Sequence, residues 1–235
     1  MDFEIPYSQN ALVDGMRDAR DNQIIACAAN LFLQNGLEQV KMVDIAGSAG
    51  VGVATLYRHF STKTSIAVCA ATLMWRQFNL MIRELVESDA FLACNGLSRL
   101  RFLLEEYKNA YLAYGDFVFF LDTFDHMVVN QQIRREELEE YGREVDSFYL
   151  IFADAYALGR SDGSILREVE FRPFYLALAH ALIGVAQKLR RGEIIPSDDF
   201  SNAQLELQCI IDMAMWSLAS ADSKEEQAAN GKRRG

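Results

Sequence analysis

The sequence predicts an all-α protein in which an N-terminal three-helix unit precedes a larger helical domain. Only three prolines and fourteen glycines interrupt the 235 residues, so long segments rich in Leu, Ala, Glu and Arg can form helices. Apolar residues recur at helical spacing along these segments, whereas the period-two alternation of strands is scarce. The apolar share of 51% excludes a disordered chain.

The first predicted helix begins near Arg17, after a flexible arm at residues 1–16. Its apolar side chains repeat with helical spacing and define one stripe, made of Ile24, Ala28, Leu31 and Phe32. We expect this helix to end at Asn35 and Gly36, because glycine adopts the left-handed conformation of a helix C-cap at little cost.

Two short helices are predicted next, at residues 42–49 and 53–60, on either side of a turn that contains Gly50 and Gly52. A tight turn between two short helices is the helix-turn-helix pattern. The side chains expected to hold the pair at a steep angle are Ile45, Ala46, Val51, Leu56 and Phe60. The outer face of the second helix is then free to enter a DNA major groove, which predicts a DNA-binding domain at residues 17–64.

The remaining chain predicts a larger helical domain at residues 65–220 and a disordered tail at 221–235, where no apolar stripe is present. We expect Thr62 or Thr64 to cap the first of its helices, and Asp116 to cap a later one. The segment "GRSDGSI" at 159–165 reads as a loop because of its turn residues. The predicted helices cover residues 65–88, 96–114, 116–128, 131–158, 172–191 and 198–220.

Charge is unevenly distributed along the chain. The formal net charge is −10, yet residues 17–64 hold five basic and four acidic side chains and are close to +1. The rest of the chain therefore carries about −11. A weakly positive surface on an acidic protein is expected to bind a polyanion specifically, and to bind it poorly without sequence contacts.

The composition argues against several other classes of protein. The four cysteines are far apart and form no Cys/His cluster, so we expect no metal site and no cofactor. No signal peptide or membrane-length apolar run of roughly 18 residues is present, which predicts a cytoplasmic protein without a membrane partner. His126 and His180 lack a Ser, Cys or carboxylate partner at a recognisable spacing, so we expect no enzyme.

The segment "IIACAANLFLQNGLEQVKMVDIAGSAGVGVATLYRHFSTKTSI" resembles the N-terminal DNA-binding domain of TetR-type (tetracycline-repressor-like) transcriptional regulators. About 45 residues carry the resemblance. The matching features, in the spacing of the family, are Ala28-Ala29, Asn35-Gly36, Asp44-Ile45-Ala46, Ala49-Gly50-Val51, Thr55-Leu56-Tyr57, Phe60 and Lys63. The resemblance implies an N-terminal reader of DNA followed by a helical ligand-binding and dimerisation domain. "DGSI" at 162–165 also resembles a loop that often precedes the last two helices in such proteins.

Nine residues are candidates for DNA binding. Val53 and Ala54 offer apolar contact to thymine methyl groups, and Arg58 suits either a guanine or a phosphate. Hydroxyl, imidazole and ammonium groups suited to phosphate oxygens are present on Thr55, Tyr57, His59 and Lys63. Lys41 stands where such families place Ser or Thr, so it can supply charge to a phosphate but cannot cap the helix. Gly52 lets its backbone N–H approach a phosphate.

An aromatic-rich zone in the middle helices is the candidate effector pocket, and ordinary core packing is the alternative. Its candidate residues are Phe78, Tyr107, Tyr111, Tyr114, Phe117, Phe124 and His126. Asp116, Asp122 and Asp125 lie near these aromatics and either favour a cationic ligand or form a solvated face.

The last two predicted helices, around 172–191 and 198–220, could pair with those of a second copy as a four-helix bundle. Ala177, Ala181 and Gly184 are small enough for close approach, and packing within one chain is the alternative. We expect a homodimeric repressor that a small-molecule ligand releases from double-stranded DNA. The alternatives are an activator, or a helical ligand-binding or protein-interaction module with weak or lost DNA binding.

Overall fold

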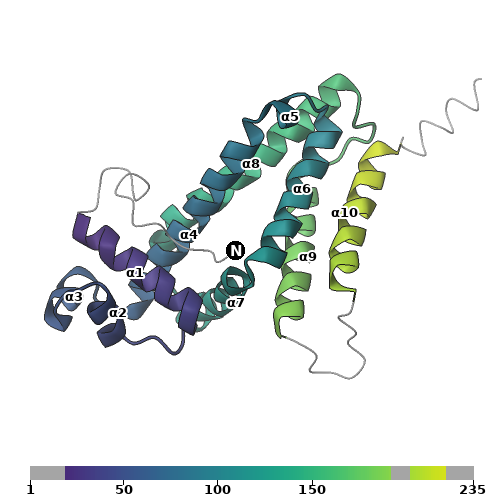
Figure 1. Cartoon of the computed structure of the whole chain (residues 1–235). Helices are drawn as coiled ribbons and strands as arrows, with labels where there is room; N and C mark the ends of the chain where they lie inside the picture. The colour runs from purple at the N-terminus through teal and green to yellow at the C-terminus, as the bar shows by residue number, and fades with distance from the viewer. Residues whose placement is uncertain (1–18, 192–201, 221–235) are drawn as a thin grey trace, which may run out of the picture. The chain divides into compact units, whose positions relative to one another are not determined.

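The computed structural model describes residues 19–191 and 202–220, and all of its regular elements are helical (Figure 1). The predicted arm at 1–16 and tail at 221–235 lie outside the described residues. The chain divides into two compact units. Of the described residues, unit 1 comprises 19–84 and 113–147, and unit 2 comprises 85–112, 148–191 and 202–220. None of the helices among the described residues is long and apolar enough to cross a membrane.

Unit 1 begins with the three helices that the sequence predicts. They are α1 (Ala19–Asn35), α2 (Met42–Ser48) and α3 (Val53–His59). Gly36 ends α1 with a φ of +81°, and its N–H donates to the carbonyl of Phe32 at 3.0 Å. Gly50 has a φ of +66° in the turn between α2 and α3. Both glycines therefore occupy left-handed positions that other residues rarely adopt.

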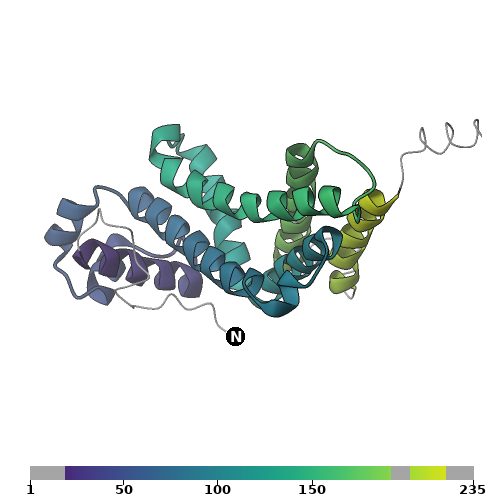
Figure 2. The same ribbon diagram turned by 90° about the horizontal axis from the view of Figure 1, so that it is seen from above.

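The apolar side chains predicted to hold α2 and α3 together are buried, except that Val51 is half-buried. Ile45, Ala46 and Leu56 are at most 1% exposed, and Phe60 is 4% exposed. Figures 1 and 2 show α2 and α3 beside α1 at the start of the chain. The helix-turn-helix packing that the sequence predicts is confirmed.

The other helices of unit 1 are most of α4 (Lys63–Val86), all of α7 (Gly115–Asn130) and the start of α8 (Glu139–Asp162). Thr62 caps α4, since its Oγ1 accepts the N–H of Ser65 at 3.1 Å. Helix α7 packs on α1 through Phe32 and Phe120, whose ring centroids lie 6.1 Å apart. A short 3-10 helix, η1 (Arg135–Leu138), precedes α8.

Unit 2 contains α5 (Asp89–Leu92), α6 (Gly96–Ala113), the rest of α8, α9 (Phe171–Arg191) and α10 (Ala203–Ala219). Helices α9 and α10 lie side by side in Figures 1 and 2. Helix α6 starts against the end of α8, where Gly96 and Gly159 bring the two backbones together. A Cβ atom built on Gly96 would lie only 1.9 Å from the backbone N of Gly159.

The "DGSI" segment forms a cap for α6 across this junction. The carboxylate of Asp162 accepts the N–H of Gly96 at 2.8 Å, and the hydroxyl of Ser164 accepts the N–H of Leu97 at 3.0 Å. Hydrogen bonds from the Ser164 side chain and from backbone N–H groups hold the pKa of Asp162 below its usual value. This segment therefore satisfies helix N–H groups far away in the sequence.

The structure corrects four predicted boundaries or roles. Asp116 does not cap α7, because the N-cap is Tyr114 and Asp116 lies in the first turn. The helix predicted from 131 begins at 139, after a turn in which Gln132 has a φ of +49°. The predicted loop at 159–165 is still helical as far as Asp162. The short α5 lies in a segment for which no helix was expected.

The contact-based division places α4 and α7 with the three N-terminal helices, because α7 packs on α1 and α4 follows α3 directly. The functional boundary at residue 64 therefore remains a prediction.

Candidate nucleic-acid interface and associated surfaces

The outer face of α2 and α3 presents most of the predicted DNA-binding residues to solvent. Six of the nine are exposed: Lys41, Gly52, Val53, Ala54, Tyr57 and Arg58. Val53 and Tyr57 are 42% and 51% exposed, although they are large apolar and aromatic side chains. Thr55 is half-buried on the same helix. This surface is therefore apolar at the start of α3 and basic at Arg58.

Lys41 occupies the N-cap of α2 without capping it through its side chain. Asp44 compensates, because its Oδ2 accepts the backbone N–H of Lys41 at 2.8 Å. The structure thus shows how α2 begins without the usual Ser or Thr. Lys41 itself is exposed to solvent.

His59 and Lys63 are engaged within the protein, which differs from their predicted role at a phosphate. The Nδ1 atom of His59 lies 2.6 Å from Oδ1 of Asp21 on α1, and the side chains of His59 and Asp21 are 17% and 22% exposed. Gln23, also on α1, donates to the carbonyl of Ala49 at 3.1 Å. Helix α1 thereby contacts the C-cap of α2 at Ala49 and the last residue of α3 at His59.

Lys63 is half-buried at the first residue of α4. Its Nζ lies 3.0 Å from the carbonyl oxygen of Leu37, 3.2 Å from that of Glu38 and 3.0 Å from that of Val40. All three acceptors belong to the loop between α1 and α2. In this structure the ammonium group of Lys63 therefore binds that loop.

Two exposed residues, one on α2 and one on α1, were not among the candidates from the sequence. Val43 on α2 is 56% exposed, and Arg20 is exposed in the first turn of α1. Val43 falls outside the apolar stripe of its own helix, which is the signal that could have identified it.

The residues predicted to line an effector pocket are distributed over both units. In unit 1, the rings of Phe78 and Phe117 lie 6.2 Å apart, and both pack against the ring of Trp75 at 5.8 Å. Phe124 in the same unit is fully buried and packs on Tyr141. Tyr114 is half-buried.

In unit 2, Tyr107 and Tyr111 pack together with their ring centroids 4.4 Å apart. Burial raises the pKa of Tyr107 to about 12, against the opposing effect of its hydrogen bond with Tyr111. Tyr107 also packs on Phe148, at 5.2 Å. These two tyrosines place hydroxyl groups inside an otherwise aromatic cluster.

His126 does not belong to either aromatic cluster. Its side chain is 69% exposed, and its Nδ1 lies 2.8 Å from the carbonyl oxygen of Asp122 on its own helix. His180 is also exposed. Among the described residues, no group of three or more His, Cys, Asp or Glu side chains is arranged to hold a metal ion.

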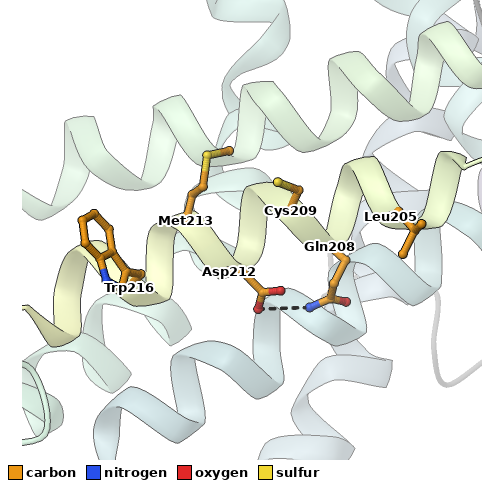
Figure 3. Close-up of a pocket in the computed structure, with 6 residues that line it drawn as sticks. All are labelled: Leu205, Gln208, Cys209, Asp212, Met213 and Trp216. Atoms are coloured by element: carbon orange, nitrogen blue, oxygen red, sulfur yellow. Dashed lines mark hydrogen bonds between the residues drawn. The ribbon is translucent and has the colours of Figure 1, made fainter.

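Helix α10 exposes an apolar face, which we call the α10 face and which lines a shallow groove (Figure 3). The groove residues are Leu205, Gln208, Cys209, Asp212, Met213 and Trp216. Leu205, Met213 and Trp216 are 64%, 58% and 74% exposed. The sequence predicts this helix from apolar residues at helical spacing, Leu205, Cys209, Met213 and Trp216, and these lie on its exposed side. A different set is buried: Leu207, Ile211, Ala214, Met215 and Leu218.

Polar residues at the edge of the α10 face attach this helix to α6. Gln208 donates to Glu105 at 2.7 Å, and Asp212 accepts from Arg101 at 2.7 Å. On neighbouring α9, small residues predicted for close approach are solvent-facing, since Ala177 and Gly184 are exposed and Ala181 is half-buried. A Cβ built on Gly184 would meet nothing within 4 Å.

Comparison with known proteins agrees with this geometry. Residues 24–68 match the family model described as bacterial regulatory proteins of the tetR family. A helix-turn-helix-type transcriptional regulator from Staphylococcus aureus (strain USA300) is 40% identical over 52 residues, which are 21% of this chain and 28% of that protein. The chain therefore matches less than a third of the length of this curated relative.

Two solved structures share the fold across most of the chain. One, from Rhodococcus sp., is assigned to the TetR-family transcriptional regulators; it has a TM-score of 0.63 and 19% identity, covering 84% of this chain and 100% of that one. The other is assigned as a transcriptional regulator from Saccharomonospora viridis in complex with choline. It has a TM-score of 0.61 and 19% identity, covering 82% of this chain and 95% of that one.

Proposed function

We propose that the chain, whose residues 24–68 match the tetR family model, is a sequence-specific DNA-binding transcriptional regulator, a homodimeric repressor that a small molecule releases from its operator. The observation that carries the proposal is the exposed outer face of α3, which presents Val53, Ala54, Tyr57 and Arg58 on a packed helix-turn-helix. The match at residues 24–68 includes these helices, so a module without DNA binding is not favoured.

The reading surface combines apolar base contacts with a small number of charges. Val53 and Ala54 at the start of α3 would contact thymine methyl groups, and Arg58 would reach a guanine or a phosphate. Lys41, Gly52, Thr55 and Tyr57 would hold the DNA backbone from the two sides of the turn. With few charges available, binding to unrelated DNA should be weak and specific binding should depend on base contacts.

The α10 face supplies the argument for a dimer. Apolar side chains as large as Trp216 and Met213 are mostly exposed in the single chain, and a contiguous apolar surface of this kind is typical of an interface. A second copy placing its own α9 and α10 against these helices would bury it as a four-helix bundle. Two readers related by a two-fold axis then suit a pseudo-palindromic operator.

The effector is proposed to bind among the aromatic side chains. Six of the seven predicted pocket residues remain candidates, and they form two separate candidate clusters: Phe78, Tyr114, Phe117 and Phe124 in unit 1, and Tyr107 and Tyr111 in unit 2. His126 is removed because it lies on the surface. A choline complex of a structural neighbour supports a small molecule as the ligand type without identifying this one. Release requires that the ligand bind the DNA-free arrangement more tightly.

The proposal also includes two general expectations, one about catalytic activity and one about location in the cell. The known proteins that resemble the chain are regulators, which supports a protein without catalytic activity. A regulator of this kind would act where the bacterial chromosome is, in the cytoplasm.

Replacing Arg58 by alanine is expected to weaken operator binding by about 1–3 kcal/mol per half-site, measured by gel shift with DNA from upstream of the gene. If Arg58 contacts a base, the loss should be confined to the operator. If Arg58 contacts a phosphate, the affinity for DNA of any sequence should fall, and the affinity should depend less steeply on salt concentration.

The matched control is Arg143→Ala, which removes an arginine that is 71% exposed on α8. Its binding should equal that of the unaltered protein. The proposal fails if the unaltered protein gives no salt-sensitive shift and Arg58→Ala behaves in the same way.

A further inference from the structure

The sequence predicts that Lys63 contacts a DNA phosphate, but in the structure its ammonium group is surrounded by backbone carbonyl groups. Its ammonium group has three N–H donors, and the structure places three carbonyl oxygens within 3.2 Å of it. The acceptors, Leu37, Glu38 and Val40, are nearly consecutive in the loop that joins α1 to α2. The donor capacity of the side chain is therefore fully used inside the protein.

The position of Lys63 in its helix supports the same conclusion. A positive side chain in the first turn of a helix is opposed by the helix dipole, and no acidic side chain is present in the first turn of α4 to offset it. Carbonyl oxygens carry partial negative charge and accept charge-assisted hydrogen bonds. The three acceptors therefore stabilise the ammonium group of Lys63, which the positive end of the helix dipole would otherwise destabilise. Lysine is disfavoured at this helix end unless such acceptors are near.

The loop that Lys63 holds leads directly into the DNA-binding surface. Val40, the last of the three acceptors, is 3% exposed and precedes Lys41, which is the N-cap of α2. The other end of the loop is Gly36, and a Cβ built there would lie 3.7 Å from the ring of Phe119 on α7. The start of α2 is thus fixed in space by the first residue of α4.

We propose that Lys63 is a positioning residue, which locks the α1–α2 loop to α4 and thereby holds Lys41 and α2 in the geometry that binds DNA. It does not contact phosphate. This inference rests on the proposed function for its consequence on DNA binding, whereas the lock itself is a property of the free protein. Loss of the lock lowers the fraction of molecules in the binding-competent arrangement.

The test compares Lys63→Met with Lys41→Met, each in the full-length protein at a temperature where circular dichroism shows both variants folded. Lys63→Met should raise the Kd for the operator about ten-fold, as expected if about a tenth of the molecules keep the competent loop. Its slope of log K against log salt should equal that of the unaltered protein. Lys41→Met should reduce the magnitude of that slope by about 1 per subunit.

A second readout uses the free protein. Backbone amides of residues 37–42 should exchange with solvent faster in Lys63→Met and at the original rate in Lys41→Met. A general loss of stability would lower the melting temperature without this local pattern and without changing the Kd of folded protein. If Lys63→Met does not fold, the ¹⁵Nζ resonance of Lys63 in the unaltered protein decides instead, and it should shift little when operator DNA is added.

Three results would overturn the proposal: a salt slope reduced in Lys63→Met as in Lys41→Met, an unchanged Kd, or a large ¹⁵Nζ shift on DNA binding. Absence of sequence-specific binding by the unaltered protein would instead reject the proposed function. In that case the exchange comparison still tests the lock.

Discussion

Replacing Met213 and Trp216 together by glutamate is expected to give a monomeric protein whose operator affinity is lower by at least about a hundred-fold. The two side chains are 58% and 74% exposed on the α10 face, and a second copy is proposed to cover them. Four glutamates at a two-fold interface would be desolvated and close to one another, which strongly opposes association. A monomer has one helix-turn-helix, so it loses the increase in affinity that comes from binding two half-sites at once.

Light scattering after size exclusion gives the mass, and fluorescence anisotropy with operator DNA gives the Kd. Leu92→Glu is the matched control, because Leu92 is 52% exposed on α5 and has no proposed partner. It should remain dimeric and bind DNA normally. A double variant that is still dimeric would show that another surface joins the subunits.

Replacing Gly96 by alanine is expected to destabilise the protein by at least about 3 kcal/mol. The new Cβ would lie 1.9 Å from N and 2.2 Å from Cα of Gly159, and 2.6 Å from the carbonyl oxygen of Ala155. These are backbone atoms of a neighbouring helix, so no side-chain rotation can relieve the overlap. Separating α6 from α8 would also break the cap that Asp162 and Ser164 provide.

Thermal denaturation followed by circular dichroism measures the effect, and the melting temperature should fall by about 6–12 °C. Gly142→Ala is the control, since it lies in α8 and an added Cβ meets nothing within 4 Å. That variant should be unchanged or more stable, because alanine favours helix. A Gly96→Ala protein with the same melting temperature as the unaltered protein would contradict the close approach of α6 and α8.

The helix-turn-helix was largely predictable from the sequence, because the residues that cap and pack its helices are close together in the chain. The α1 C-cap at Gly36 and the packing of Leu56 and Phe60 depend on residues close in the chain, and the bounds of α2 and α3 agree with the predicted ones within one residue. The exposure of Val53, Ala54 and Arg58 follows from the helical period of α3. Sequence periodicity alone was enough for these positions.

The hydrogen bonds of His59, Lys63 and Asp162, which the sequence did not predict, join distant segments. Asp21 and His59 are 38 positions apart, and Lys63 is 23–26 positions from its three acceptors. A hydrogen bond of this kind has no local signal, so an accessible lysine and a loop-binding lysine look alike in sequence. The same limit applies to Asp162, which caps a helix that begins 66 positions earlier.

The apolar stripes predicted where helices form, but they did not predict whether the core or another molecule covers each apolar face. The stripe through Leu205, Met213 and Trp216 correctly predicted α10, yet it is exposed in the single chain. Periodicity identifies an apolar face, whether the protein's own core or a second molecule covers it. The aromatic residues of the proposed effector pocket share this ambiguity, because core packing and ligand contact require the same side chains.

Selection of DNA sites from a random pool by the purified protein tests the central claim most directly. Enriched sequences should contain two inverted half-sites whose centres are about 34–36 Å apart or a multiple of that distance, one for each reader of a dimer. Recovery of sequences without a common motif, or of single half-sites without an inverted partner, would contradict a homodimeric sequence-specific regulator.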